Sequence, residues 1–193
     1  MTPKPRPLTD EEKAGIVLAV QATFTTLRDL YEQVQPIFES HGFPAPSIGV
    51  VARELPEKVE RAIAQHCASF TKNQPHAGLQ RDGADWKVKV CKDAGLTLPP
   101  SRIVSGEHYI VVNYRANTQV VKVWVLWNAQ DHFFSARPRG SSGARALIET
   151  LALPSIQVLQ AAPPSGTRIG SAKPAPMAKA TLRIHRRARA MGT

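Results

Sequence analysis

Cysteine is scarce and hydrophobic runs are short in this chain of 193 residues. Cys67 and Cys91 are too few for a disulfide scaffold, and neither stands in a CxxC or Cys/His spacing that would hold a structural zinc. No apolar run approaches the roughly 20 residues of a membrane-spanning helix. Residues 1–7 are basic and proline-rich, with no hydrophobic signal region after them. We therefore expect a cytoplasmic protein that does not associate with membranes.

The motifs of several common enzyme classes are also missing. The chain contains no GxGxxG or Walker loop and no GxSxG nucleophile motif. Its six histidines include no HxH or HExxH pair, so we assign none of them to a metal. Nucleotide-cofactor enzymes and serine hydrolases of these kinds therefore have no support in the sequence.

Acidic residues are missing from residues 160–193, although this segment carries seven of the ten excess positive charges of the chain. Its cations are Arg168, Lys173, Lys179, Arg183, Arg186, Arg187 and Arg189. The segment also contains four prolines among Ala, Gly and Ser, so it cannot bury enough apolar surface to offset the entropy of ordering. We expect residues 161–193 to form a disordered basic arm.

A long helix is predicted near the start of the chain, after a disordered segment at residues 1–8. Thr9 and Glu12 form a capping box, which predicts a helix that begins near Asp10. Apolar residues then recur every three or four positions, at Val20, Phe24, Leu27, Tyr31, Val34 and Phe38. We expect this stripe to pack on its own domain and Pro36 to bend or end the helix. The alternative is that the stripe binds a second copy or another protein.

A second helix is predicted over residues 56–70, with Pro56 in its tolerant first turn. Its apolar side would contain Val59, Ile63, His66 and Phe70. We therefore divide the ordered part of the chain into an N-terminal helical region at 9–55 and an α/β core at 56–160.

The pattern changes to alternation after Asn73. Trp86, Val88 and Val90 should face one way, and Lys87, Lys89 and Cys91 the other, which is typical of a strand with one apolar face. Further strands are predicted at Leu79–Asp82, Ile110–Tyr114, Val120–Trp127 and Ile156–Leu159, with a short helix over Ala144–Ala152. The strands over 110–114 and 120–127 should pair as a hairpin in the centre of the sheet, because both are almost continuously apolar.

The resulting order, αβββαβ, together with PHAGL at residues 75–79 and WKVKV at residues 86–90, resembles the restriction-endonuclease-like, or PD-(D/E)xK, nuclease superfamily. The resemblance covers roughly residues 57 to 160, the size of one domain. In that family two carboxylates on adjacent strands hold Mg²⁺, and a lysine helps to activate the attacking water. Lys89 matches the family lysine, but Gly78 and Lys87 stand where the acids are expected. The resemblance therefore implies a degenerate nuclease site that needs no cofactor.

A shifted register leaves an active Mg²⁺-dependent endonuclease open as an alternative. In this register Asp85-Trp86-Lys87 is itself an Asp-x-Lys triplet. The catalytic residues would be Asp85, Lys87 and Lys89, and the candidate metal ligands are Glu60, Asp82 and Asp85.

Nucleic acid, with DNA favoured, is the partner that the charge distribution predicts. Candidate phosphate contacts are Arg81, Lys92, Arg102, Arg115, Lys122, Arg137, Arg139, Arg183, Arg186, Arg187 and Arg189. The leading hypothesis is thus a nucleic-acid-binding pseudoenzyme with an N-terminal helical extension and a basic arm. The alternatives are an active endonuclease and a protein–protein interaction module.

Overall fold

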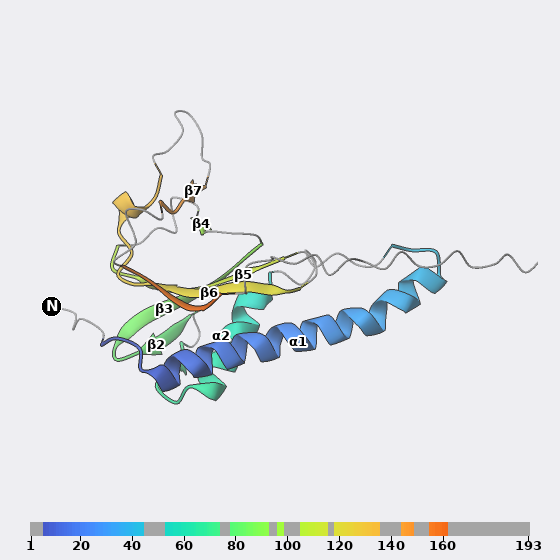
Figure 1. The fold of residues 1–193 in the computed structure, drawn as a ribbon, viewed down its shortest axis with the longest axis horizontal. Coiled ribbons are helices and arrows are strands. Elements are labelled where there is room, and N and C mark those ends of the chain that lie inside the picture. The colour runs from blue at the N-terminus through green and yellow to red at the C-terminus, as the bar shows by residue number, and fades with distance from the viewer. Residues whose placement is uncertain are drawn as a thin grey trace, which may run out of the picture. The chain divides into compact units, whose positions relative to one another are not determined.

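The computed structural model describes residues 6–44, 53–73, 78–92, 96–98, 105–115, 118–135, 144–148 and 155–161. All of them lie in one compact unit, Met1–Ala162, in which two helices cover one face of a six-stranded sheet (Figure 1). The predicted mixture of helices and strands is confirmed. Among these residues, no helix is both long and apolar enough to span a membrane.

Helix α1 (Asp10–Ser40) begins where the capping box predicts. Thr9 Oγ1 accepts a hydrogen bond from the Glu12 N–H at 3.2 Å, and Glu12 Oε2 accepts one from the Thr9 N–H at 2.7 Å. Pro36 does not end the helix, which continues to Ser40. Pro36 lies in an exposed turn, where water can hydrogen-bond the Glu32 carbonyl that loses its helical partner.

Helix α2 (Leu55–His66) begins one residue before the predicted start and ends four residues before the predicted end. The Cys67 N–H still donates to the Ile63 carbonyl at 2.8 Å, but the backbone of Cys67 is extended, and the chain turns there. Phe70 lies beyond the end of the helix, and its side chain is buried. His66 is exposed, so its predicted place on the apolar side is wrong.

The large sheet has the strand order β1-β2-β3-β5-β6-β8. Its strands are β1 (Thr71–Lys72), β2 (Leu79–Arg81), β3 (Ala84–Lys92), β5 (His108–Tyr114), β6 (Val120–Leu126) and β8 (Ile156–Ala161). β3 and β5 pair in parallel, and the other neighbours are antiparallel. Every residue of β5 is buried, so the predicted central hairpin is confirmed.

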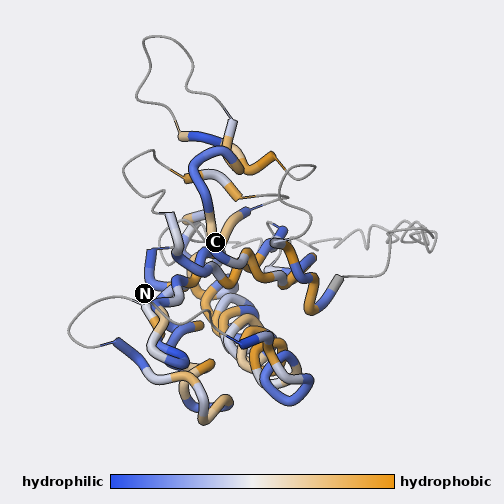
Figure 2. Tube along the Cα trace, turned by 90° about the vertical axis from the view of Figure 1, so that its left-hand side faces the viewer, coloured by the Kyte–Doolittle hydropathy of each residue, from blue (hydrophilic) through white to orange (hydrophobic). Residues whose placement is uncertain are grey.

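Two hydrophobic cores lie on opposite faces of this sheet. On the helix side, α1 and α2 pack against alternate residues of the strands, among them Trp86, Ile110 and Val125. Figure 2 shows hydrophobic residues along both the helix and the strands that meet there. On the other side, Val111 and Trp124 pack under the smaller layer. Because α1 shares the core of the sheet, it does not form a separate domain.

The smaller layer contains β4 (Thr97–Leu98), β7 (Arg145–Ala146) and the 3₁₀ helix η3 (Asp131–Phe133). The helix expected over Ala144–Ala152 is wrong at Arg145 and Ala146, which pair with β4. The buried Arg145 guanidinium donates to the Asp131 carboxylate and to the carbonyls of Phe134 and Ser135. These bonds hold the segment in an extended form within the layer.

Trp124 is buried, and its Nε1 donates to Asn113 Oδ1 at 2.6 Å. We expect Trp124→Ala to lower the free energy of unfolding by about 3–5 kcal/mol, because it opens a large cavity. Denaturant unfolding of both proteins measures the difference. An unchanged transition would contradict the central position of β6.

Stability should also fall in acid because of Glu12. Burial raises the pKa of this carboxyl, but hydrogen bonds from Arg81 outweigh it and lower the pKa from 4.5 to about 2. A lowered native pKa stabilises the fold above pH 4.5, and this contribution is lost as the pH falls towards 2. Glu12→Gln should remove this part of the acid dependence in melting curves. An identical pH profile in the variant would contradict the assignment.

Candidate nucleic-acid interface

The face of the sheet opposite the helices carries Lys87 and Lys89 of the predicted catalytic residues and Lys122 of the predicted phosphate contacts. On β3, Trp86 and Val88 are buried in the helix-side core, so Lys87, Lys89 and Cys91 lie on the other face. The predicted alternation along this strand is therefore confirmed.

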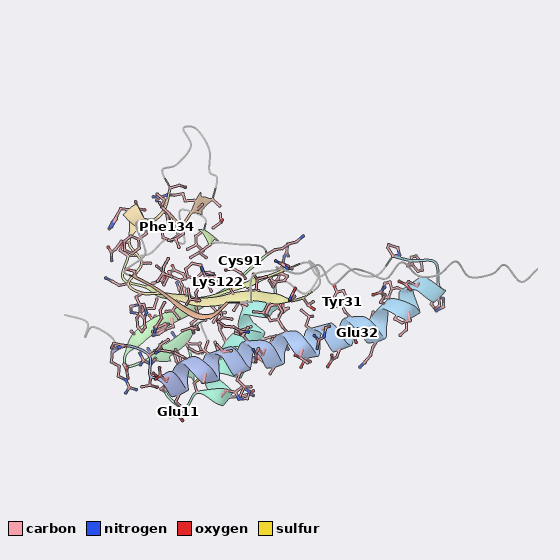
Figure 3. All side chains as sticks on the ribbon, viewed as in Figure 1. Glu11, Tyr31, Glu32, Cys91, Lys122 and Phe134 are labelled. Atoms are coloured by element: carbon pink, nitrogen blue, oxygen red, sulfur yellow. The ribbon has the colours of Figure 1, made fainter. Side chains whose placement is uncertain are left out.

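A polar row crosses three strands near one end of this face. Cys91 on β3 pairs with Asn113 on β5, which pairs with Lys122 on β6. Figure 3 shows Cys91 and Lys122 on the side of the sheet away from α1. Lys122 Nζ lies 5.4 Å from the centre of the Trp124 ring, and that indole is held by its bond to Asn113. The aromatic face attracts the ammonium group and so orients it over the sheet.

Further cations lie around this row. Lys89 is two residues before Cys91 on the same face, and Arg115 follows β5. Lys92 pairs with Tyr114 of the helix-side core, so its side chain lies on the helix face and outside this group. The turn after Arg115 is closed by its N–H, which donates to the Gln119 carbonyl at 2.9 Å. We call Lys89, Arg115 and Lys122 the basic end of the sheet.

Within β3, β5 and β6 the acidic residue is Asp85, near the other end of β3 and four residues, about 13 Å, before Lys89.

Lys87, on the same face of β3 but nearer its start, is paired with Glu107. The Lys87 ammonium forms an ion pair with Glu107 Oε1, and the Tyr109 hydroxyl donates to Glu107 Oε2 at 2.7 Å. The sequence analysis did not identify Glu107 as the partner of Lys87. Glu107 lies just before β5, and β5 becomes a neighbour of β3 only through parallel pairing in the fold. Such a long-range neighbour leaves no local pattern.

Arg81 is a correction to the predicted phosphate contacts. It is 1% exposed, and its guanidinium donates to both carboxylate oxygens of Glu12 at 2.9 Å. It also donates to the carbonyls of Arg6 and Pro7. Because the Arg81 side chain is itself buried and its guanidinium is occupied by these partners, Arg81 is a structural residue and is closed to a phosphate backbone.

The three candidate metal ligands have separate partners. Glu60 Oε2 accepts the Gly78 N–H at 3.1 Å, and Asp82 Oδ2 accepts from Arg6 Nε at 2.9 Å. Asp85 Oδ1 accepts from Asn73 Nδ2 at 3.4 Å, on the face of β3 opposite the helix that carries Glu60. In the part of the chain that the structure describes, no group of three His, Cys, Asp or Glu side chains could hold a metal.

The backbone conformation at residue 78 favours glycine. Its φ is +123°, and a Cβ built there would lie 2.9 Å from the Trp86 carbonyl oxygen. A carboxylate at this position, as in the nuclease family, would therefore require the hairpin of β2 and β3 to shift.

The pKa values of Cys67, Cys91 and His108 are shifted in the directions that keep each group uncharged at neutral pH. Burial raises the pKa of Cys91, and burial together with nearby acids raises that of Cys67 to about 11. Burial also lowers the pKa of His108, with a contribution from Arg81. The neutral His108 Nδ1 accepts the Asn128 N–H at 2.8 Å. These groups are packing elements of the fold.

The remaining predicted contacts lie outside the described residues. They are Arg102, Arg137, Arg139, Arg183, Arg186, Arg187 and Arg189.

Comparison of the chain with protein-family models finds no match. A comparison with curated proteins also finds no similar sequence.

Gly78→Ala should destabilise the protein by more than about 1 kcal/mol, because it combines an unfavourable φ with a backbone clash. Gly83→Ala is the matched control, since Gly83 has φ +73° and open space around it. Denaturant unfolding compares the two variants. Equal stability of the two variants would show that the backbone clash at Gly78 does not constrain the residue at this position.

Proposed function

We propose that this protein binds the phosphate backbone of nucleic acid, with duplex DNA as the favoured partner, through the basic end of the sheet. The observation that carries the proposal is the gathering of Lys89, Arg115 and Lys122 at one end of β3, β5 and β6. Displacement of counterions from phosphates by such cations is the main driving force of non-specific binding.

The spacing of these cations suits the phosphate backbone of a nucleic acid better than a small anion. Lys89 on β3 and Lys122 on β6 are two strand spacings apart and offset by two residues along the strands, which is about 12 Å in all. This separation spans about three base-pair steps along one strand of DNA. The acid-free segment at residues 160–193 adds seven cations to the same chain. Together they would give weak, salt-dependent binding without sequence preference.

The proposal includes a restriction-endonuclease-like core whose catalytic motif is degenerate. Its support is the WKVKV motif on β3, next to a β2–β3 hairpin in which glycine is required at residue 78. Lys87, at the second acid position, is paired with Glu107. Lys89 then has a binding role in place of a catalytic one, and no cofactor is required.

Replacing Lys89 and Lys122 by alanine together should weaken binding of a fluorescent DNA duplex and lower the slope of log K against log salt by nearly 2, at about 0.9 per lost phosphate contact. Lys58→Ala is the control, because Lys58 is an exposed lysine on α2, on the helix side. It should change affinity much less. If Lys58→Ala and the Lys89/Lys122 double variant reduced the affinity equally, the proposed surface would be overturned.

Truncation after Ala162 should also reduce affinity and flatten the salt dependence, because it removes the seven cations. This end point retains the whole of β8, which extends to Ala161. Anisotropy titrations at several salt concentrations compare the two lengths. The same affinity and salt slope in both would show that the segment makes no contact with nucleic acid.

A further inference from the structure

His108 is a buried histidine that the proposed nucleic-acid contact does not use. It is the first residue of β5, at the opposite end of that strand from Arg115 and the basic end. Its side chain is 4% exposed, and the centre of its ring lies 4.9 Å from that of Trp86 and 5.6 Å from that of Trp127. Close packing against two indoles restricts rotation of the imidazole, so the directions of its two nitrogens are fixed.

The His108 ring holds the turn that joins β6 to η3, residues 127–130, which we call the β6–η3 turn. His108 Nδ1 accepts the backbone N–H of Asn128 at 2.8 Å. Asn128 has a φ of +47°, a conformation that is uncommon for residues other than glycine. The turn therefore depends on the hydrogen bonds that hold its backbone. It leads directly into η3, where Phe133 packs on the face of the sheet opposite the helices.

The hydrogen bond from Asn128 requires a neutral imidazole. A ring nitrogen that accepts a hydrogen bond must carry a lone pair, so the proton of neutral His108 is on Nε2. A second proton can bind only at Nδ1, where it would point at the Asn128 N–H. Two donors cannot form a hydrogen bond with each other, so protonation of His108 and the closed turn exclude one another.

The charges that act on His108 change little in mildly acidic solution. Burial lowers the pKa of His108 from 6.5, Arg81 on β2 lowers it further, and Glu107 acts in the opposite direction. Glu107 is paired with Lys87, and Glu12, the partner of Arg81, has a pKa of about 2. The two indoles against the ring carry no charge. Because the native pKa of His108 is lowered, the stabilisation from the neutral ring is fully present above pH 6.5 and is lost as the pH falls through the lowered value.

We propose that His108 is an acid-sensitive latch, which holds the β6–η3 turn closed while its imidazole is neutral and opens the turn when it takes up a proton. Opening would loosen η3 and the smaller layer, while the helix-side core stays packed. The latch works at a higher pH than the loss of the Glu12 charge. It does not rest on the proposed nucleic-acid contact, which lies at the other end of β5.

NMR of the full chain, titrated from about pH 7.5 to about pH 5, tests the latch without any substitution. The Asn128 amide signal should shift with the same midpoint as the His108 ring protons, below pH 6.5, and its protection from hydrogen exchange should fall several-fold. The indole N–H signal of Trp124 should keep its position. Uptake of a proton by His108 with an unchanged Asn128 amide would overturn the proposal. So would a His108 that stays neutral until the whole protein unfolds.

Two histidine variants separate the latch from a general effect of acid. His108→Gln replaces the imidazole with an amide whose oxygen can accept the Asn128 N–H and which does not titrate, so the turn should stay closed over the whole range. His66→Gln is the matched control, because His66 is an exposed histidine at the end of α2, and its turn should open as in the wild type. Opening of the His108→Gln turn at the wild-type midpoint would contradict the latch, as would loss of the response in His66→Gln.

Discussion

The buried ion pair between Glu12 and Arg81 is the interaction on which the arrangement of the layers depends. It joins the first turn of α1 to β2, and Arg81 also holds the backbone of Arg6 and Pro7. A guanidinium with its charge matched in this way can be buried, whereas removing either partner would leave an isolated charge inside the protein. The pair therefore anchors one end of α1 against the sheet and leaves the other end to project.

The two faces of β3 carry different kinds of side chain. Residues of β3 that face the helices fill a core, and those on the other face include Lys89 and Cys91. The small layer covers this second face around Val111 and Trp124, while Lys122 remains at its border. Hydrophobic cores on both faces of the sheet thus provide a rigid support for the cations at one end of its strands.

Local patterns explain what could be predicted. The capping box and the alternation along β3 are read from neighbouring residues, and both hold. Arg81, Arg145 and Glu107 could not be placed, because their partners are distant in sequence or set by strand pairing. From the sequence alone, an arginine that is buried in an ion pair is not distinguishable from one that binds phosphate. Asn113 could have been noticed, since it is the one amide in an otherwise apolar run of β5 and holds Trp124.

The most direct test of the account is to map a short DNA duplex onto the protein by NMR titration at low salt. The account predicts that the amide signals of Lys89, Asn113 and Lys122 shift progressively and return when salt is added, because the contact is electrostatic. The signals of α2 residues such as Lys58 should stay in place. Shifts centred on the helices, or none at the ends of β3 and β5, would contradict it.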